Sequence, residues 1–189
     1  LAILKGLGCR VWRRGDTVGV DASVLAGAEI SRELMEEMRS SVVFLGAMLP
    51  RMGRAALTYP GGCELGPRPI DLHLAGLVQM GACPQLEGER LLLTAPAGLH
   101  GADITLRFPS VGATETLLLA AACAKGRTIL RGAAREPEIA DLAAFLNRCG
   151  GCIEGAGSST IRIEGRRGLS GCCFSPLPDR IFASTLACG

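Results

Sequence analysis

Three stretches of the chain repeat one pattern, and this repetition limits the fold more than any other feature of the sequence. An apolar helix end is followed by a glycine, an extended stretch, a polar turn and a second extended stretch, in residues 4–22, 77–95 and 146–165. The pattern recurs about every 70 residues, with anchor glycines at Gly8, Gly81 and Gly150. We therefore predict an α/β fold made of repeated α+β units, in which helices pack on small sheets.

A second predicted helix also recurs, and its two copies lead into segments of different length. One copy spans 39–52 and ends at Gly53, and the other spans 112–125 and ends at Gly126. Before the next matched apolar position, the first copy carries about four extra residues, which fall in 60–67. Gly and Pro dominate this insertion, so its backbone can approach a ligand closely and move, as in binding loops and lids. An ordinary surface turn is the alternative.

Charge, aromatic content and hydropathy argue against two classes of partner. Lys and Arg number 20 against 18 Asp and Glu, and the resulting net charge of +2 provides no basic surface for a phosphate backbone. Aromatic residues make up 4% of the chain, which leaves few platforms for unpaired bases. No apolar run approaches the roughly 18 residues that span a bilayer. We predict neither a nucleic-acid partner nor a membrane partner.

The cysteines indicate a reducing compartment. Nine of them are scattered from Cys9 to Cys188, and no secretory signal precedes them, so we expect free thiols in a cytoplasmic protein. Cys149 and Cys152 form a C-x-x-C motif that would suit zinc or redox chemistry. No second such pair and no paired His at ligand spacing accompanies it, so we predict no metal site, and a metal or redox module remains only an alternative.

Cys63 and Arg68 are the strongest candidates for chemistry. Cys63 lies at the centre of the Gly- and Pro-rich insertion, and a cation close to a thiol favours the reactive thiolate. Arg68 stands between Pro67 and Pro69, whose fixed backbone would hold its guanidinium toward a carboxylate or phosphate. A small buried cysteine is the alternative for Cys63.

Two predicted helix starts would add positive potential to the same cleft. Ser110 is a good N-cap for the helix that begins at Val111, and Gly112 would let an anion reach the free N–H groups of the first turn. The repeat places Arg39 where the related helix begins. These groups predict a cleft that handles a phosphate or diphosphate, although Ser110 could be a cap and nothing more.

Acidic residues and a histidine flank these positions. Asp71 begins a predicted helix that runs to Met80, where it would either favour the positive helix end or contact a ligand. His73 matches an apolar position of the next unit, so we expect it to pack. Glu136 and Glu138 follow Arg135, and we expect them to support nearby arginines because bare carboxylates would repel anionic ligands. Arg180 is a further candidate cation.

Several of these residues resemble, in order, the motifs of the UDP-N-acetylglucosamine enolpyruvyl transferase family of peptidoglycan synthesis. The resemblance runs along nearly the whole chain and is carried by Pro60-Gly61-Gly62-Cys63 with Gly66, Arg68-Pro69 and Asp71-Leu72-His73, by Met38-Arg39-Ser40-Ser41, by residues 108–115 and 134–139, and by Pro178-Asp179-Arg180-Ile181. It implies two lobes, each an inside-out α/β barrel of three repeated units with helices inside and sheets outside. Residues 1–178 would form most of the lobe that carries the catalytic loop, and 179–189 would begin a second lobe.

The resemblance also implies a reaction and a role for each candidate. The enolpyruvyl group of phosphoenolpyruvate would move to the 3-hydroxyl of UDP-N-acetylglucosamine with release of phosphate, without a cofactor, as the first committed step of peptidoglycan synthesis. Cys63 would be the general acid and the target of fosfomycin, and Arg39 and Arg68 would hold the phosphate and carboxylate. Substrate contacts would come from Arg68, Pro69, Ile70, Asp71, Leu72, Ser110, Val111 and Gly112, with support from Glu136, Glu138 and Arg180.

Departures from the family pattern leave alternatives open. The family's N-terminal Lys-Asn pair and its catalytic Asp have no counterpart here, and Phe182 and Ser184 stand where the family usually has Glu and Gly. We therefore expect a fragment, cut at both ends and inactive alone. A sibling 5-enolpyruvylshikimate-3-phosphate synthase and a non-catalytic nucleotide-sugar binding protein are the two alternatives.

Overall fold

A computed structural model describes residues 1–58 and 70–188, and for Arg39 it describes the backbone alone. The first half contains α1 (Ala2–Gly6), β1 (Arg10–Arg14), β2 (Thr17–Asp21), β3 (Glu29–Ile30), α2 (Arg32–Glu37), the 3-10 helix η1 (Arg39–Val43), α3 (Phe44–Met52) and β4 (Arg54–Thr58). The second contains α4 (Asp71–Gln79), β5 (Cys83–Glu87), β6 (Arg90–Thr94), β7 (Asp103–Thr105), α5 (Val111–Ala122), β8 (Arg127–Arg131), α6 (Pro137–Arg148), β9 (Cys152–Glu154), β10 (Thr160–Glu164) and α7 (Arg180–Ala187).

Two four-stranded sheets have the same construction. Their strand orders are β3-β4-β6-β5 and β7-β8-β10-β9. In each, a parallel pair, β3 with β4 or β7 with β8, is followed by two antiparallel pairs. Each parallel connection carries helices, as parallel pairing requires. The fold is therefore a mixed α/β arrangement, as the sequence predicted at the level of fold class.

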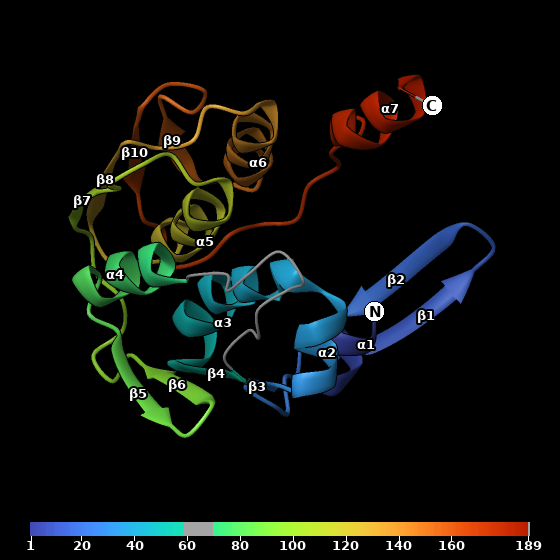
Figure 1. Ribbon diagram of the computed structural model, residues 1–189, viewed down its shortest axis with the longest axis horizontal. Coiled ribbons are helices and arrows are strands. Elements are labelled where there is room, and N and C mark those ends of the chain that lie inside the picture. The colour runs from blue at the N-terminus through green and yellow to red at the C-terminus, as the bar shows by residue number, and fades with distance from the viewer. Residues whose placement is uncertain (59–69, 189) are drawn as a thin grey trace.

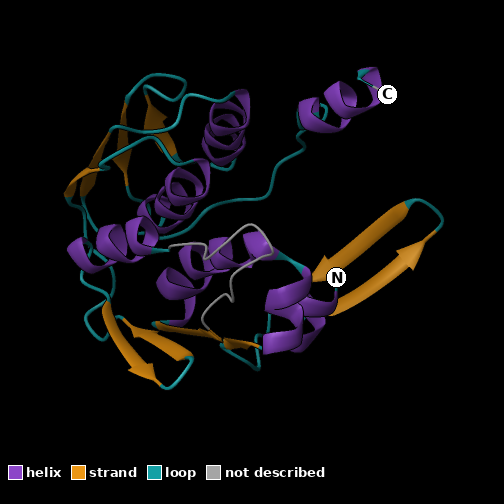
Figure 2. Cartoon of the chain, viewed as in Figure 1, coloured by secondary structure: helices purple, strands orange, loops and turns teal. Residues whose placement is uncertain are grey.

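The two four-stranded sheets lie at the outside of the molecule and α3, α4, α5 and α6 lie on their inner side, whereas α7 and the β1–β2 hairpin project away from this body (Figures 1 and 2). Helix α5 is central and contacts α3, α4, α6 and η1. It is buried on most sides, with Ala113, Leu117, Leu118, Ala120 and Ala121 fully buried, as expected of a helix that other elements surround.

Glycine allows these helices to pack closely. A Cβ at Gly46 of α3 would lie 2.2 Å from the carbonyl oxygen of Thr116 in α5, and one at Gly76 of α4 would lie 2.5 Å from Leu117 Cδ2. No side chain fits at either distance, so α3 and α4 approach α5 through bare backbone.

The anchor glycines all adopt the same left-handed backbone. Their φ angles are 93°, 95° and 92° at Gly8, Gly81 and Gly150. Each one turns the chain from a helix end into the first strand of a hairpin, a conformation that residues with a Cβ rarely adopt.

Two predicted helix boundaries are wrong. The helix expected over 39–52 begins as the 3-10 turn η1, in which the Ser41 amide donates to the Met38 carbonyl, and becomes α-helical only at Phe44. The helix expected over 112–125 begins at Val111 and ends at Ala122. Lys125 has left it because its amide donates to Leu99 O at 2.9 Å. The hydrogen bond to Leu99, and not the local sequence pattern, therefore determines where α5 ends.

Candidate functional site

Three of the sequence-predicted site residues, Cys63, Arg68 and Pro69, lie outside the described residues. Arg39 is the first residue of η1, which packs against α5, and its side chain is not described. The described part of the site therefore consists of the start of α4, from Ile70 onward, and of the starts of α5, α6 and α7.

The start of α4 separates buried from exposed candidates. Ile70 precedes the helix and Leu72 lies in its first turn, and both are buried, with 2% and 6% of their surface exposed. Asp71 points outward and forms an ion pair with Arg107. An acidic group in the first turn is also favoured by the helix dipole. Asp71 is thus the charged and partly exposed member of this segment.

The start of α5 has the predicted capping geometry. Ser110 precedes the helix, and its Oγ accepts a hydrogen bond from the Ala113 amide at 3.3 Å. Val111 and Gly112 form the first turn and are half-buried. This cap satisfies the Ala113 donor and leaves the amides ahead of it in the first turn without an intrahelical partner.

His73 joins the two helix starts. Its Nδ1 lies 2.9 Å from Thr116 Oγ1 in α5, and a Cβ at Gly112 would lie 3.2 Å from its Cε1. The ring is 7% exposed. The predicted packing role of His73 is confirmed, and its position beside Gly112 brings the Asp71 segment and the Ser110 segment together.

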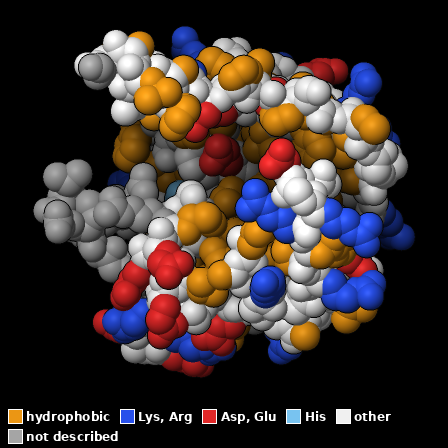
Figure 3. Space-filling model, turned by 90° about the vertical axis from the view of Figure 1, so that its right-hand side faces the viewer, with side chains coloured by type: hydrophobic (Ala, Val, Ile, Leu, Met, Phe, Trp, Pro, Cys, Tyr) orange, Lys and Arg blue, Asp and Glu red, His pale blue; other side chains and the backbone are white. Residues whose placement is uncertain are grey.

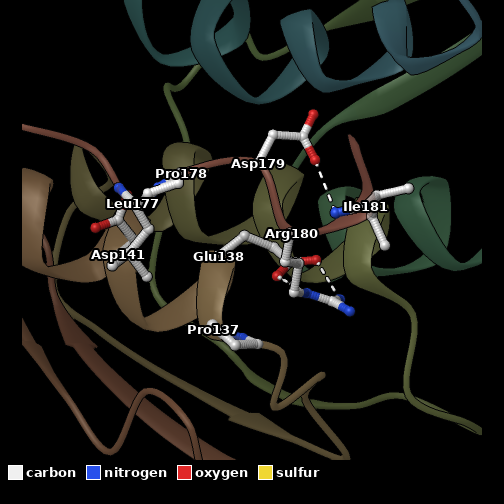
Figure 4. A pocket seen from close by; sticks show the side chains of 8 residues that line it. All are labelled: Pro137, Glu138, Asp141, Leu177, Pro178, Asp179, Arg180 and Ile181. Carbon is white, nitrogen blue, oxygen red and sulfur yellow. Dashed lines mark hydrogen bonds and ion pairs between the residues drawn. The ribbon is translucent and has the colours of Figure 1, made fainter. Parts of the chain in front are cut away.

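A pocket of about 400 Å³ lies where α6 begins and where the chain enters α7 (Figure 4). The two helix starts face each other across it, and its lining is Pro137, Glu138, Asp141, Leu177, Pro178, Asp179, Arg180 and Ile181. Asp179 Oδ1 accepts from the amides of Ile181 and Phe182 at 2.9 and 3.0 Å, which caps α7.

Glu138 and Arg180 form a two-pronged ion pair in this pocket. Arg180 Nε donates to Glu138 Oε2 at 3.1 Å and Nη2 donates to Oε1 at 2.9 Å. These hydrogen bonds lower the pKa of Glu138 and raise that of Arg180. Glu136, the residue before α6, adds to the rise through its charge. Glu138 thus pairs directly with Arg180, and Glu136 acts on the same arginine through its charge alone.

Glu115 belongs with this acidic group, and sequence reasoning did not single it out as a site residue. Burial is the main cause that raises the pKa of Glu115, and the negative charge of Glu138 raises this pKa further. Glu115 is the one ionisable residue in α5, an otherwise apolar helix. That isolation was the signal, since a charge in a buried helix requires a reason. The charge of Glu138 thus influences Glu115, which lies near the start of α5.

Arg107 was also missed, because it precedes the Phe108-Pro109-Ser110 motif and has no counterpart among the candidates. It is exposed and pairs with Asp71 from a position 36 residues away.

Figure 3 shows the side of the molecule toward which α7 and the β1–β2 hairpin project: acidic side chains lie in its hollowed centre, and Lys and Arg side chains gather beside them.

A cluster of metal ligands and a membrane-spanning helix are both absent from the part of the chain that the structure describes. Within it, no three or more His, Cys, Asp or Glu side chains are grouped as metal ligands would be. Among the same residues, no helix is long and apolar enough to cross a membrane.

Comparison with known sequences identifies the family. A sequence model described as EPSP synthase (3-phosphoshikimate 1-carboxyvinyltransferase) matches residues 1–189. The chain belongs to the EPSP synthase family.

Curated relatives point to one branch of the EPSP synthase family. A protein named UDP-N-acetylglucosamine 1-carboxyvinyltransferase from Trichlorobacter lovleyi is 47% identical over 186 residues, which are 98% of this chain and 44% of the relative. One of the same name from Nitratidesulfovibrio vulgaris is 49% identical over 183 residues, 97% of this chain and 43% of the relative. The chain therefore spans less than half the length of these relatives.

Solved structures of enolpyruvyl transferases share the fold. The enolpyruvyl transferase NikO from Streptomyces tendae matches with a TM-score of 0.72 at 28% identity, over 87% of this chain and 39% of that one. EPSP synthase from Acinetobacter baumannii matches with a TM-score of 0.65 at 22% identity, over 90% of this chain and 39% of that one, which shows likeness of fold alone.

Proposed function

We propose that the complete protein containing this chain transfers the enolpyruvyl group of phosphoenolpyruvate to the 3-hydroxyl of UDP-N-acetylglucosamine and releases phosphate. The observation that carries the proposal is the near-complete match of the chain to relatives bearing that name, at 47% and 49% identity. It would make the protein a transferase of peptidoglycan synthesis, with these two small molecules as its partners. The scattered cysteines favour the cytoplasm as its compartment.

The proposed fold of the whole protein has two lobes. Residues 1–178 would form most of one lobe, an inside-out barrel of repeated units, and 179–189 would begin the second. The shared strand order of the two four-stranded sheets supports the repeats. No residue of α7 is buried by the described part of the chain, and this exposure supports a boundary just before the helix.

In the proposed site, Cys63 is the general acid and Arg39 and Arg68 hold the phosphate and carboxylate of phosphoenolpyruvate. The starts of α4 and α5 supply the second substrate's contacts, through residues 68–72 and through Ser110, Val111 and Gly112. The first-turn amides of α5 suit a diphosphate, because they have no acceptor within the helix and lie at its positive end. The packing of His73 against Gly112 keeps these two segments at a fixed spacing.

Phosphate release from the complete protein tests the reaction. We expect phosphate from phosphoenolpyruvate only when UDP-N-acetylglucosamine is present, and none with shikimate 3-phosphate. Turnover of shikimate 3-phosphate would instead identify the sibling 5-enolpyruvylshikimate-3-phosphate synthase. Binding of UDP-N-acetylglucosamine without phosphate release would identify a non-catalytic binding protein.

Two single-cysteine variants test the proposed role of Cys63. Cys63→Ala should abolish phosphate release while binding of the nucleotide sugar is retained, because the variant loses a proton donor and no binding group. Cys83→Ala is the matched control, since Cys83 is an exposed thiol on β5. Equal activity of both variants would contradict the assignment of Cys63.

A further inference from the structure

Beyond the proposed reaction site, one face of α6 carries an extended segment, residues 166–179, which we call the strap. The strap runs from β10 to α7 and contacts α6 at successive turns. Its contacts are made at Asp141 and Phe145 of α6 and at Cys149, the residue that caps the end of this helix. Arg180, which follows the strap as the first residue of α7, adds a contact at Glu138. These four positions are three, four and four residues apart and therefore share one helix face.

The contacts between the strap and α6 are hydrogen bonds at two positions and a ring contact at a third. The Ser170 amide donates to the Cys149 carbonyl at 2.7 Å, and Ser170 Oγ donates to the same oxygen at 3.0 Å. Phe174 packs edge-to-face on Phe145 with ring centroids 5.5 Å apart. The Leu177 amide donates to Asp141 Oδ2 at 3.1 Å. The strap thus arrives at the Arg180–Glu138 pair through an ordered series of contacts.

Two thiols lie close together where the strap passes the end of α6. Cys149 Sγ lies 3.3 Å from Cys172 Sγ. A disulfide bond is about 2.05 Å long, so the two sulfur atoms need to approach by only about 1 Å more. Cys149 ends α6 and is buried, whereas Cys172 is half-buried on the strap.

The alternation of the strap selects Cys172 over its neighbour. Successive side chains of an extended segment point to opposite sides. Cys172 and Phe174 are half-buried and face α6, while Gly171, Cys173 and Ser175 are exposed. Cys152 follows Cys149 closely in sequence but begins β9, and it lines a different, shallow pocket with Arg127 and Arg162.

We propose that Cys149 and Cys172 are a site of reversible disulfide formation, in which a low-molecular-weight disulfide is the oxidant and the product clamps the strap to α6. This proposal does not depend on the proposed enzymatic function.

The chemistry is a double thiol–disulfide exchange. The thiolate of Cys172, the more accessible sulfur, attacks one sulfur of the oxidant, whose S–S bond breaks and releases one thiolate. Cys149 then loses its proton and attacks Cys172 Sγ, which breaks the mixed disulfide and releases the second thiolate. Two protein thiols are oxidised, one small disulfide is reduced to two thiols, and the two cysteine protons go to the leaving thiolates. The hydrogen bond to Cys172, together with burial, raises the pKa of Cys149 and fits its role as the second sulfur to react.

Peptide mapping of the full chain after treatment with oxidised glutathione tests the site. Trypsin cuts after Arg148, Arg162, Arg167 and Arg180, so the disulfide would join peptides 149–162 and 168–180. Each peptide also holds a decoy, Cys152 or Cys173, which permits two matched double variants. Cys152→Ser with Cys173→Ser retains the proposed pair, and Cys149→Ser with Cys172→Ser retains only the decoys.

We expect the joined peptides to form at least about tenfold faster in the variant that retains Cys149 and Cys172, and reductant to separate them. Equal rates in the two variants would overturn the proposal. So would the absence of joined peptides while the exposed thiols Cys83 and Cys188 become glutathionylated.

Thermal unfolding gives a second readout that does not depend on the serine variants. The disulfide closes a loop that includes β9 and β10, so it restricts the unfolded chain. Oxidised wild-type protein should therefore melt at a higher temperature than reduced protein, and Cys172→Ala, which leaves the buried Cys149 in place, should show no such difference. A rise of equal size in Cys172→Ala would contradict the site.

Discussion

The guanidinium of Arg180 grips the carboxylate of Glu138 with two parallel hydrogen bonds, although the two residues are 42 positions apart. The same fork geometry occurs between Arg131 and Asp103, at 3.1 and 3.2 Å. That second pair joins β8 to β7 and does not line the pocket at α6. A third such fork joins Arg90 to Glu29, at 3.0 and 3.2 Å. Of these three pairs among the described residues, only Arg180–Glu138 lies at the proposed junction.

Removal of the charge at Glu138 should reduce turnover by the complete enzyme. In Glu138→Gln one acceptor oxygen becomes a donor and the fork to Arg180 is lost, so kcat/KM should fall by about tenfold to hundredfold through misplacement of Arg180. Thermal stability should change little, because exposed ion pairs contribute little. Steady-state kinetics with Asp103→Asn as the control checks this, and an equal loss in both variants would show a general effect of breaking such pairs.

A methyl group at Gly112 should strain the contact between α4 and α5. The added Cβ would lie 3.2 Å from His73 Cε1, and the ring is held by Thr116, so Gly112→Ala should lower the free energy of unfolding by about 1 kcal/mol. In a His73→Ala background the same change should be neutral or stabilising by about 0.5 kcal/mol, because alanine favours the helix. Denaturant titration measures both, and Gly168→Ala, which meets open space, is the control. An identical effect in both backgrounds would disprove the contact.

Loss of the Ser110 hydroxyl should weaken the start of α5. Ser110→Ala leaves the Ala113 amide without its acceptor, which should cost about 1 kcal/mol of stability. Ser110→Asp retains an acceptor and adds a charge that the helix dipole favours, so it should remain close to wild type in stability. The aspartate should nevertheless weaken binding of the nucleotide sugar, because it places a negative charge where the diphosphate is proposed to lie. Chemical denaturation and calorimetric titration separate the two effects.

Glu115 and Glu138 should have opposite effects on the pH dependence of stability. The pKa of Glu115 in the folded state lies above its ordinary value of 4.5, so the folded form retains a proton that the unfolded form releases. Its contribution is full below pH 4.5 and is lost as pH rises through the raised pKa. The pKa of Glu138 lies below 4.5, so its contribution is present above that pH and is lost as pH falls through the lowered value.

The Glu→Gln variant at each position should remove the pH dependence of stability that this glutamate contributes. Glu115→Gln should flatten the fall in stability above pH 4.5, and Glu138→Gln should remove the small part of the loss on acidification that its exposed ion pair contributes. Unfolding free energies measured across pH check both. If Glu115→Gln changed only the acid side, the raised pKa of Glu115 would be refuted.

Local features of the fold could be predicted from the sequence. The start of α4 at Asp71, the Ser110 cap and the turns at Gly8, Gly81 and Gly150 depend on residue types whose preferences act over a few positions. The end of α5 could not, because the Lys125 amide bonds to Leu99, and no local pattern records that competition.

The sequence indicated candidate residue types for the site, but it did not indicate which residues pair with one another. Glu138 and Arg180 were both candidates, with an expected supporting role for the glutamate, yet their fork depends on the path of the strap across α6. The link between Asp71 and Arg107 and the influence of Glu138 on Glu115 likewise join segments far apart in the chain. A single sequence carries no signal for contacts of this kind, whereas the isolation of Glu115 in an apolar helix was visible and was overlooked.

The missing side chain at Gly46 has a consequence for how the molecule melts. The Thr116 carbonyl occupies the place where a side chain at residue 46 would lie, so the backbone of α3 packs directly on the backbone of α5. Helix α3 leads into β4 of one four-stranded sheet, and α5 leads into β8 of the other. Separation of the half that contains α3 and β4 from the half that contains α5 and β8 would expose the alanine-rich surface of α5 to water along its whole length. Neither half can loosen alone without that exposure, so the body of the protein should unfold in one cooperative step.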